Sequence, residues 1–196
     1  MKRSHHDKEI VSGILLTSAE QRILLDRARE AIKRYLRKEK GAHPAEEELP
    51  MALMKHCGAF VTLRRAGRLR GCVGRFETNQ TLVSVVEQMA VSAASRDLRF
   101  LPVAPEEVDD LSIEISVLTP LHRISSIDEI EIGRHGIYLK KGVRAGTYLP
   151  KVARDAGWTR EEFLEHCSLE KAGLGWEGWK EAQIYIYEAI EFGESG

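Results

Sequence analysis

Residues 69–76 read LRGCVGRF and place a cysteine between two glycines inside a run with the character of a β-strand. Glycine weakens the interior of a strand and is normally avoided there. Gly71 and Gly74 therefore predict a bulge that re-aims the side chain between them, or a place where another backbone or a ligand approaches closely. Cys72 is the candidate catalytic thiol that this pattern singles out.

Arginines surround this cysteine in the sequence, five of them within twelve residues: Arg64, Arg65, Arg68, Arg70 and Arg75. A nearby guanidinium favours the thiolate form of Cys72, and with it nucleophilicity or metal affinity. Arg70 and Arg75 can hold an anionic group by bidentate contacts. Arg96 and Arg99, from a later segment, can do the same. The pattern is equally typical of a buried free cysteine that packs as a small hydrophobic residue, and the residue types alone do not separate these interpretations.

Glu114 is the candidate acid–base residue. Residues 112–118 alternate between apolar and polar types, which is typical of a strand with one buried face. Glu114 lies on the polar side, where a carboxylate can give a proton to a ligand or take one from it. A solvent-exposed strand glutamate with no chemical role fits the same pattern.

The composition restricts the class of protein. The 196 residues are 43% hydrophobic and 30% charged, which excludes disordered and fibrous classes. The cysteines at positions 57, 72 and 167 form no CxxC pair, so they predict a reducing compartment rather than a disulfide scaffold. The histidines and cysteines lack the spacing of a metal site, and none is predicted. No segment is long and apolar enough for a signal peptide or a membrane span, and we expect a cytoplasmic protein.

The net charge of −1 hides a division along the chain. Residues 1–100 carry 19 Lys and Arg against 12 Asp and Glu, whereas residues 101–196 carry 10 against 18. Such a division is typical either of an anion-binding face or of two oppositely charged faces of one body. The near-neutral total does not favour a dedicated nucleic-acid binder, which usually has a basic domain.

The apolar periodicity predicts helices interspersed with hairpins. Ser18 and Gln21 form a capping-box signature at the start of the first helix, and Gly41 is its predicted stop. Later elements are a hairpin of 59–63 and 69–76, a helix over 81–94, a strand over 112–118, a hairpin of 136–140 and 147–149, a helix over 159–172 and a final strand over 182–192. This order predicts an α+β fold, with helices packed on a mixed or antiparallel sheet. We assign residues 1–16 to a lead-in and 17–194 to one domain.

Several blocks resemble, in the same order, those of the AMMECR domain family, whose prokaryotic members are called AmmeMemoRadiSam system protein A. The blocks are GAFVTL at 58–63, LRGCVG at 69–74, RDLRF at 96–100, IEISVL at 113–118, GIYL at 136–139 and GTYLP at 146–150. Val73 stands where the family more often has isoleucine. The resemblance extends over residues 18–193, which is nearly the whole chain.

The resemblance implies a fold and partners rather than a reaction. It implies an α+β fold with a larger and a smaller lobe, and a cysteine motif near the cleft between them. Prokaryotic members are grouped with a Memo-like protein, which resembles non-haem-iron extradiol dioxygenases, and with a radical S-adenosylmethionine protein. No established reaction and no cofactor come with the resemblance.

Three functions are consistent with these observations, and the sequence does not decide whether the chain is an enzyme. In the first, Cys72 is a nucleophile or carrier, Glu114 is the acid or base, and a small anionic ligand is bound by Arg70, Gly71, Gly74, Arg96 and Arg99. The second is a non-catalytic adaptor that docks the Memo-like and radical enzymes. The third, which we rank last, is a nucleic-acid module built on the basic first helix and the arginine-rich hairpin.

Overall fold

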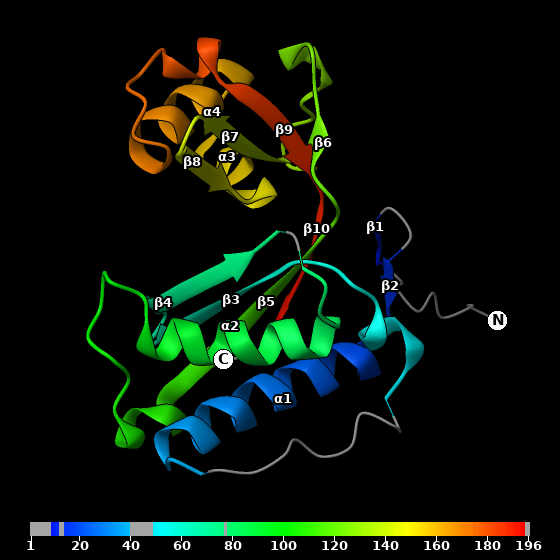
Figure 1. The fold of residues 1–196 in the computed structure, drawn as a ribbon, viewed down its shortest axis with the longest axis vertical. Coiled ribbons are helices and arrows are strands. Elements are labelled where there is room, and N and C mark those ends of the chain that lie inside the picture. Colours follow the sequence, from blue (N-terminus) through cyan, green and yellow to red (C-terminus); the bar gives the residue numbers. More distant parts are fainter. Residues whose placement is uncertain (1–8, 12–13, 40–48, 77, 195–196) are drawn as a thin grey trace, which may run out of the picture. The chain divides into compact units, whose positions relative to one another are not determined.

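The computed structural model describes residues 9–11, 14–39, 49–76 and 78–194, which form two compact units (Figure 1). The first unit consists of the described residues up to Leu118 together with those from Ile190 onward. The second unit is Thr119–Ala189. Each unit combines helices with a four-stranded sheet, which confirms the predicted α+β fold.

The first unit is a sheet covered by two helices. Its strands and helices are β1 (Glu9–Val11), β2 (Ile14–Leu16), α1 (Ser18–Leu36), β3 (Ala59–Arg65), β4 (Arg68–Arg75), α2 (Leu82–Ser95), β5 (Leu111–Leu118) and β10 (Ala189–Gly193). β1 and β2 pair as an antiparallel hairpin inside the segment predicted as a lead-in. The four-stranded sheet has the order β10-β5-β3-β4, which leaves β4 at an edge.

The N-terminus of α1 is capped by a different pair from the one that the sequence predicts. Thr17 is the N-cap: its hydroxyl accepts a hydrogen bond from the Glu20 N–H, and the Glu20 carboxylate accepts one from the Thr17 N–H. The capping box is therefore Thr17–Glu20 rather than Ser18–Gln21. The helix ends at Leu36, and the stop predicted at Gly41 lies outside the described residues. None of the described helices has the length and apolar character that a membrane-spanning segment requires.

The two faces of the first sheet have different characters. Ala59, Val61 and Leu63 on β3 are fully buried on the face that α1 and α2 cover (Figure 1). Side chains alternate along a strand, so Thr62 and its neighbours two residues away lie on the opposite face. One face is thus a dry aliphatic core, and the other carries polar groups.

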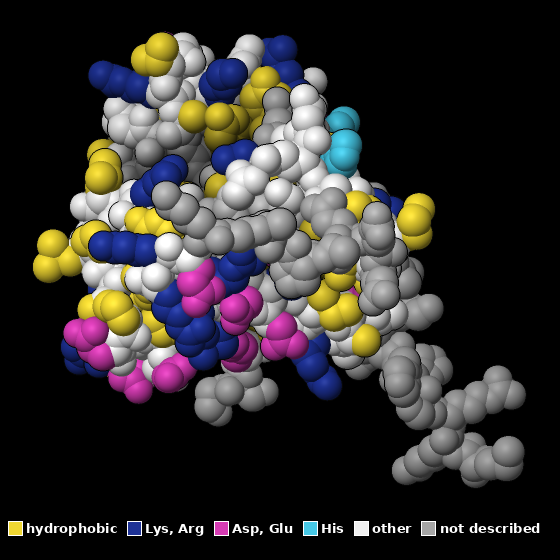
Figure 2. All heavy atoms as spheres, turned by 60° about the horizontal axis from the view of Figure 1, so that its bottom comes forward, with side chains coloured by type: hydrophobic (Ala, Val, Ile, Leu, Met, Phe, Trp, Pro, Cys, Tyr) yellow, Lys and Arg dark blue, Asp and Glu magenta, His cyan; other side chains and the backbone are white. Residues whose placement is uncertain are grey.

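Ion pairs within the first unit join the basic first half of the sequence to the acidic second half. Guanidinium and ammonium groups from residues 29–70 pair with carboxylates from residues 107–194, in the pairs Arg29–Glu194, Lys33–Asp109, Arg64–Glu114, Arg65–Glu107, Arg65–Asp110 and Arg70–Glu107. Figure 2 shows basic and acidic side chains side by side on part of the face that it draws. The division of charge along the chain therefore supplies ion pairs inside one unit.

The second unit has its own sheet and its own core. Its elements are β6 (His122–Arg123), β7 (Gly136–Lys141), β8 (Arg144–Tyr148), α3 (Pro150–Ala156), α4 (Arg160–His166) and β9 (Gln183–Tyr187), with the sheet order β6-β9-β7-β8. The predicted capping box of Thr159 and Glu162 is confirmed at the start of α4. The helix continues beyond His166 as a π-helical turn, Cys167–Lys171, which accounts for its predicted length.

The final strand predicted over 182–192 is in fact two strands in different sheets. β9 pairs with β6 and β7, whereas β10 lies beside β5. The break falls at Glu188, whose N–H donates to Thr119 Oγ1 at 2.8 Å and whose carbonyl accepts from the Thr119 N–H at 3.0 Å. The apolar alternation continues through this break, so periodicity alone does not reveal the change of sheet.

Candidate functional site around Cys72

A β-bulge decides which face of the sheet Cys72 occupies. Arg65 opposes Arg68 next to the turn, but the register shifts by one residue after Arg64, so that Thr62 opposes Cys72. A shift of one residue exchanges the two faces of a strand. With an unbroken register, residue 71 would oppose Thr62, and Cys72 would point toward the helices. The bulge thus places the thiol on the polar face, as the flanking glycines suggested.

Cys72, Thr62 and Glu114 form a row across three strands. Thr62 on β3 opposes Cys72 on β4 and also opposes Glu114 on β5. The Thr62 hydroxyl donates a hydrogen bond to the Cys72 Sγ at 3.2 Å, and the cysteine itself is half-buried. This hydrogen bond holds the sulfur in a fixed position beside the Thr62 hydroxyl. The row therefore contains the Cys72 thiol, the Thr62 hydroxyl that donates a hydrogen bond to it, and the Glu114 carboxylate two strands away.

Glu114 is held in place by an arginine. The Arg64 Nε donates to Glu114 Oε1 at 2.5 Å, and both side chains are about one-third exposed. Arg64 also donates to the Gly67 carbonyl at 3.3 Å. The Glu114 carboxylate thus stays on the polar face beside Thr62, with one oxygen engaged by the guanidinium.

Asp97 and Arg99 clamp the backbone of Cys72 at the sheet edge. The Cys72 N–H donates to Asp97 Oδ2 at 2.8 Å, and Arg99 Nη2 donates to the Cys72 carbonyl at 3.3 Å. Arg99 also grips Asp97 with two hydrogen bonds, at 2.9 and 2.7 Å. The Arg99 guanidinium lowers the pKa of Asp97 to about 2. An edge strand exposes unpaired backbone groups, and at Cys72 these two side chains take the place of a neighbouring strand.

Arg70 serves the scaffold rather than the thiol. Its guanidinium binds Glu107 at 3.1 and 2.9 Å and also donates to the carbonyls of Leu101 and Pro102. These contacts lower the pKa of Glu107 to about 2, with Arg70 as the largest cause. Arg70 is the extra residue of the bulge, so its ion pair fixes the irregularity that orients Cys72.

The glycines and Arg96 are explained by contacts within the protein. A Cβ on Gly71 would lie 2.2 Å from the carbonyl oxygen of Ala93 on α2, and one on Gly74 would lie 2.3 Å from the Phe60 ring. Both positions therefore need glycine for close packing. Arg96, at the end of α2, lines a separate hollow. The structure thus places Glu114 in one row with Cys72 and Arg99 on the Cys72 backbone. Ligand contacts at all the predicted positions stay predictions.

Thr62, Asp97 and Arg64 are not among the site residues predicted from the sequence. Thr62 lies in the GAFVTL block and Asp97 in the RDLRF block, so the sequence pattern marks both segments but not these two residues. Their relation to Cys72 depends on strand register and on the path of the loop after α2, which spacing along the chain does not reveal.

The other cysteines have different surroundings. Cys57 and Cys167 are buried free thiols, and burial raises the pKa of Cys57 to about 11 and that of Cys167 to about 12. In the described part of the chain, His, Cys, Asp and Glu side chains do not gather in threes as metal ligands would. The half-buried Cys72 is thus the cysteine whose setting suits chemistry.

Comparisons with known proteins give consistent matches along nearly the whole chain. The AMMECR1 family model matches residues 25–192. Protein MK0488 of Methanopyrus kandleri is 40% identical over 193 residues, covering 93% of this chain and 92% of that protein. A protein of Methanothermobacter thermautotrophicus is 39% identical over 189 residues, covering 92% and 97%. The crystal structure of the uncharacterised protein PH0010 of Pyrococcus horikoshii matches with a TM-score of 0.83 and 36% identity, covering 92% and 94%.

Proposed function

The chain belongs to the AMMECR1 family, and on that premise we propose that Cys72 is the reactive thiol of a site that binds or transforms a small anionic ligand. The observation that carries the proposal is the hydrogen bond from the Thr62 hydroxyl to the Cys72 Sγ at 3.2 Å. A threonine that donates to sulfur on the polar face of a sheet orients that sulfur, and the half-buried Cys72 is within reach of a ligand there. A cysteine that only fills space needs no such donor.

The geometry supports distinct roles for the residues of the row. Cys72 supplies the sulfur that attacks or carries the ligand. Neighbouring strands are about 4.8 Å apart, so Glu114 lies roughly 10 Å from Cys72 along the row. We place the small ligand between them, over Thr62. From there the carboxylate can give or take a proton. Arg99 and Arg64 border the row and each already binds a carboxylate, Asp97 and Glu114 respectively. We propose that their remaining guanidinium N–H groups contact an anionic ligand.

A comparison of two alkylating reagents tests the anionic preference. We expect the ratio of the iodoacetate rate to the iodoacetamide rate at Cys72 to be about fivefold higher in the folded protein than in urea. This corresponds to about 1 kcal/mol of attraction between the reagent carboxylate and a nearby guanidinium. Arg99→Gln should lower the ratio, and added salt should do the same. A ratio equal to that of the unfolded chain would contradict the anionic ligand.

Exposed apolar residues next to the clamp support a partner protein. Leu98 is 100% exposed and Leu101 is 84% exposed, on either side of Arg99 in the loop after α2. Exposed leucines of this kind are typical of protein–protein contacts. We therefore propose that this loop docks the Memo-like or the radical S-adenosylmethionine protein that the family resemblance implies.

Co-purification at low salt tests this contact. The Memo-like protein should be retained by the wild type and by Cys72→Ser, and lost with Leu98→Asp combined with Leu101→Asp. Retention of the partner by the double variant would exclude the loop as the docking surface. Arg68→Gln, which alters an exposed residue of β4, is the matched control.

A further inference from the structure

A polar stripe runs along the side of α2 that faces away from the core. Ser84, Gln88, Ser92 and Arg96 recur at intervals of four residues, which places them on one side of a helix. The Gln88 side chain donates to the Ser84 hydroxyl at 3.2 Å. The stripe therefore offers two serine hydroxyls and a glutamine amide, and Arg96 adds a guanidinium at its C-terminal end.

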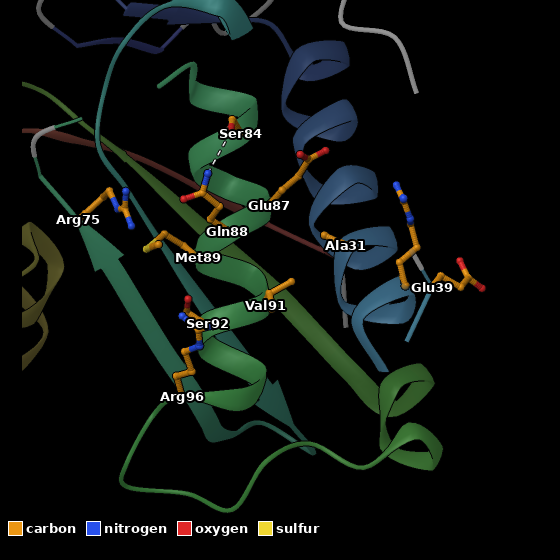
Figure 3. Close-up of a pocket in the computed structure, with 11 residues that line it drawn as sticks. Ala31, Glu39, Arg75, Ser84, Glu87, Gln88, Met89, Val91, Ser92 and Arg96 are labelled. Atoms are coloured by element: carbon orange, nitrogen blue, oxygen red, sulfur yellow. Dashed lines mark hydrogen bonds between the residues drawn. The ribbon is translucent and has the colours of Figure 1, made fainter. Parts of the chain in front are cut away.

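The stripe lines a hollow of about 470 Å³. β4 contributes Arg75 to the lining, and α1 contributes Ala31 and Arg34. Figure 3 shows Arg75 and Arg96 on the same flank of α2 as Ser92. The volume lies within the range of small-molecule sites.

Arg75 and Arg96 differ from the arginines that brace the rest of β4. Arg64, Arg70 and Arg99 each form an ion pair with a carboxylate. Across the described ranges, no carboxylate pairs with Arg75 or Arg96, and Arg75 donates only to the amide oxygen of Gln80 at 3.2 Å. Two guanidinium groups at the same hollow are thus available for an anion.

The carboxylates of the hollow do not cancel these charges. Glu87 is buried and pairs with Arg27 at 3.2 Å. Glu39 lies 3.6 Å from the Arg37 guanidinium. Each lining carboxylate is therefore engaged by an arginine that is not part of the lining, and the hollow keeps an excess of positive charge.

We propose that this hollow binds the phosphate group of a small hydroxyl-bearing molecule, such as a sugar phosphate. Arginines bind phosphate oxygens in a bidentate manner, and serine and glutamine side chains match the hydroxyl groups of a sugar. The described lining contains no aromatic ring on which a base could stack, which favours a sugar phosphate over a nucleotide. The site is separate from Cys72. Side chains alternate along a strand, so Arg75 and Val73 lie on the helix side of the sheet and Cys72 lies on the other side.

Calorimetric titration with glucose 6-phosphate tests the proposal, with glucose as the uncharged control. We expect the wild type to bind the phosphate ester and not the sugar. Arg75→Gln and Arg96→Gln should each weaken binding about tenfold or more, because each removes charge-assisted hydrogen bonds. The matched control Arg68→Gln removes the same charge elsewhere on β4 and should change affinity less than about twofold.

Amide chemical shifts of the wild type give a second measurement that needs no variant. The largest changes on adding glucose 6-phosphate should fall on residues 84–96 and on Arg75. Cys72→Ser should bind the ester as the wild type does, so this site and the proposed thiol site can fail independently. Three results would overturn the proposal: no binding at millimolar ester, binding by Arg75→Gln and Arg96→Gln as tight as that of the wild type, or a loss of binding in Cys72→Ser.

Discussion

Cys72 in the first unit and Cys167 in the second unit each belong to a segment that is part of a close helix–strand contact at a glycine, but the two sulfur atoms have opposite environments. In each unit a strand glycine lets a helical segment lie against the sheet. Gly71 admits α2 against β4, and Gly146 admits the π-helical turn against β8. The first approach leaves the cysteine on the polar face, whereas the second leaves Cys167 0% exposed within the core of its unit.

The difference lies in what contacts each sulfur. Cys167 is surrounded by the apolar core that includes Phe163 and Leu164, and burial raises its pKa to about 12. Cys72 instead accepts a hydrogen bond from Thr62. A fully buried thiol packs as a hydrophobic residue, whereas a half-buried thiol with a hydrogen-bond donor beside it is oriented and open to a ligand. For Cys72, the strand register rather than the residue type sets this environment.

The largest expected effect comes from filling the glycine contacts. Gly71→Ala and Gly146→Ala should each cost about 3 kcal/mol of unfolding free energy, because the new Cβ would lie 2.2 and 2.4 Å from backbone atoms in a packed interior. The three tryptophans all lie in the second unit. Fluorescence therefore measures Gly146→Ala, and amide exchange on β4 measures Gly71→Ala.

The milder contact at Gly193 provides the control for these variants. A Cβ there would lie 3.2 Å from the Glu114 Cγ and 3.2 Å from the Ile113 carbonyl oxygen, about 1 Å farther than the contact at Gly71. Gly193→Ala should therefore cost less than about 1 kcal/mol. Equal costs at all three positions would mean that the close approach of helix and strand does not constrain the cysteines.

The clamp at Cys72 gives the next effect. Asp97→Asn should lower the unfolding free energy at pH 7 by about 2 kcal/mol, since the pKa of Asp97 falls from 3.8 to about 2 on folding. A lowered carboxyl pKa stabilises the fold above pH 4, and this contribution is lost as the pH falls toward 2. The variant should therefore lose less stability than the wild type between pH 4 and 2. Parallel pH profiles would contradict the Arg99–Asp97 contribution.

Replacing Cys167 and Cys72 in turn with serine distinguishes a cysteine that stabilises the core from one that does not. Cys167→Ser should cost about 1.5 kcal/mol, because it puts a hydroxyl into an apolar core. Cys72→Ser should change the unfolding free energy by less than about 0.5 kcal/mol, since Thr62 can donate to a serine oxygen as well. Urea unfolding followed by amide exchange measures both. A larger cost at Cys72 would make it the structural cysteine of the two.

The smallest effect concerns the donor itself. Thr62→Val should slow alkylation of Cys72 about fivefold, which corresponds to about 1 kcal/mol for one hydrogen bond to sulfur. Thr62→Ser keeps the hydroxyl and should react at nearly the wild-type rate. If valine and serine variants reacted equally, the hydrogen bond would have no influence on the thiol.

Local patterns predicted much of this fold. The hairpin of β3 and β4, the helix α2 and the strand β5 are confirmed within two residues at their ends, because their apolar alternation matches their burial. Cys72 stood out because glycine is unusual inside a strand. The prediction of a single final strand over 182–192 was wrong, because β9 and β10 continue one alternating pattern but belong to different sheets.

The candidate site was only half predictable, for a physical reason. Cys72, Glu114 and Arg99 carry side chains whose chemistry is visible in the sequence. Thr62 acquires its role from a one-residue bulge, and Asp97 from a loop that returns to the sheet edge. Both depend on contacts distant along the chain, which no local pattern encodes.

Competitive alkylation of the folded wild type at pH 8, with each cysteine quantified by mass spectrometry, tests the central claim most directly. Burial raises the pKa of Cys167 to about 12, so only about one molecule in ten thousand has this thiol ionised at that pH. We predict that iodoacetamide modifies Cys72 at least about a hundredfold faster than Cys57 or Cys167. In urea the three rates should converge. Equal protection of all three cysteines in the folded protein would contradict the assignment of Cys72 as the reactive thiol.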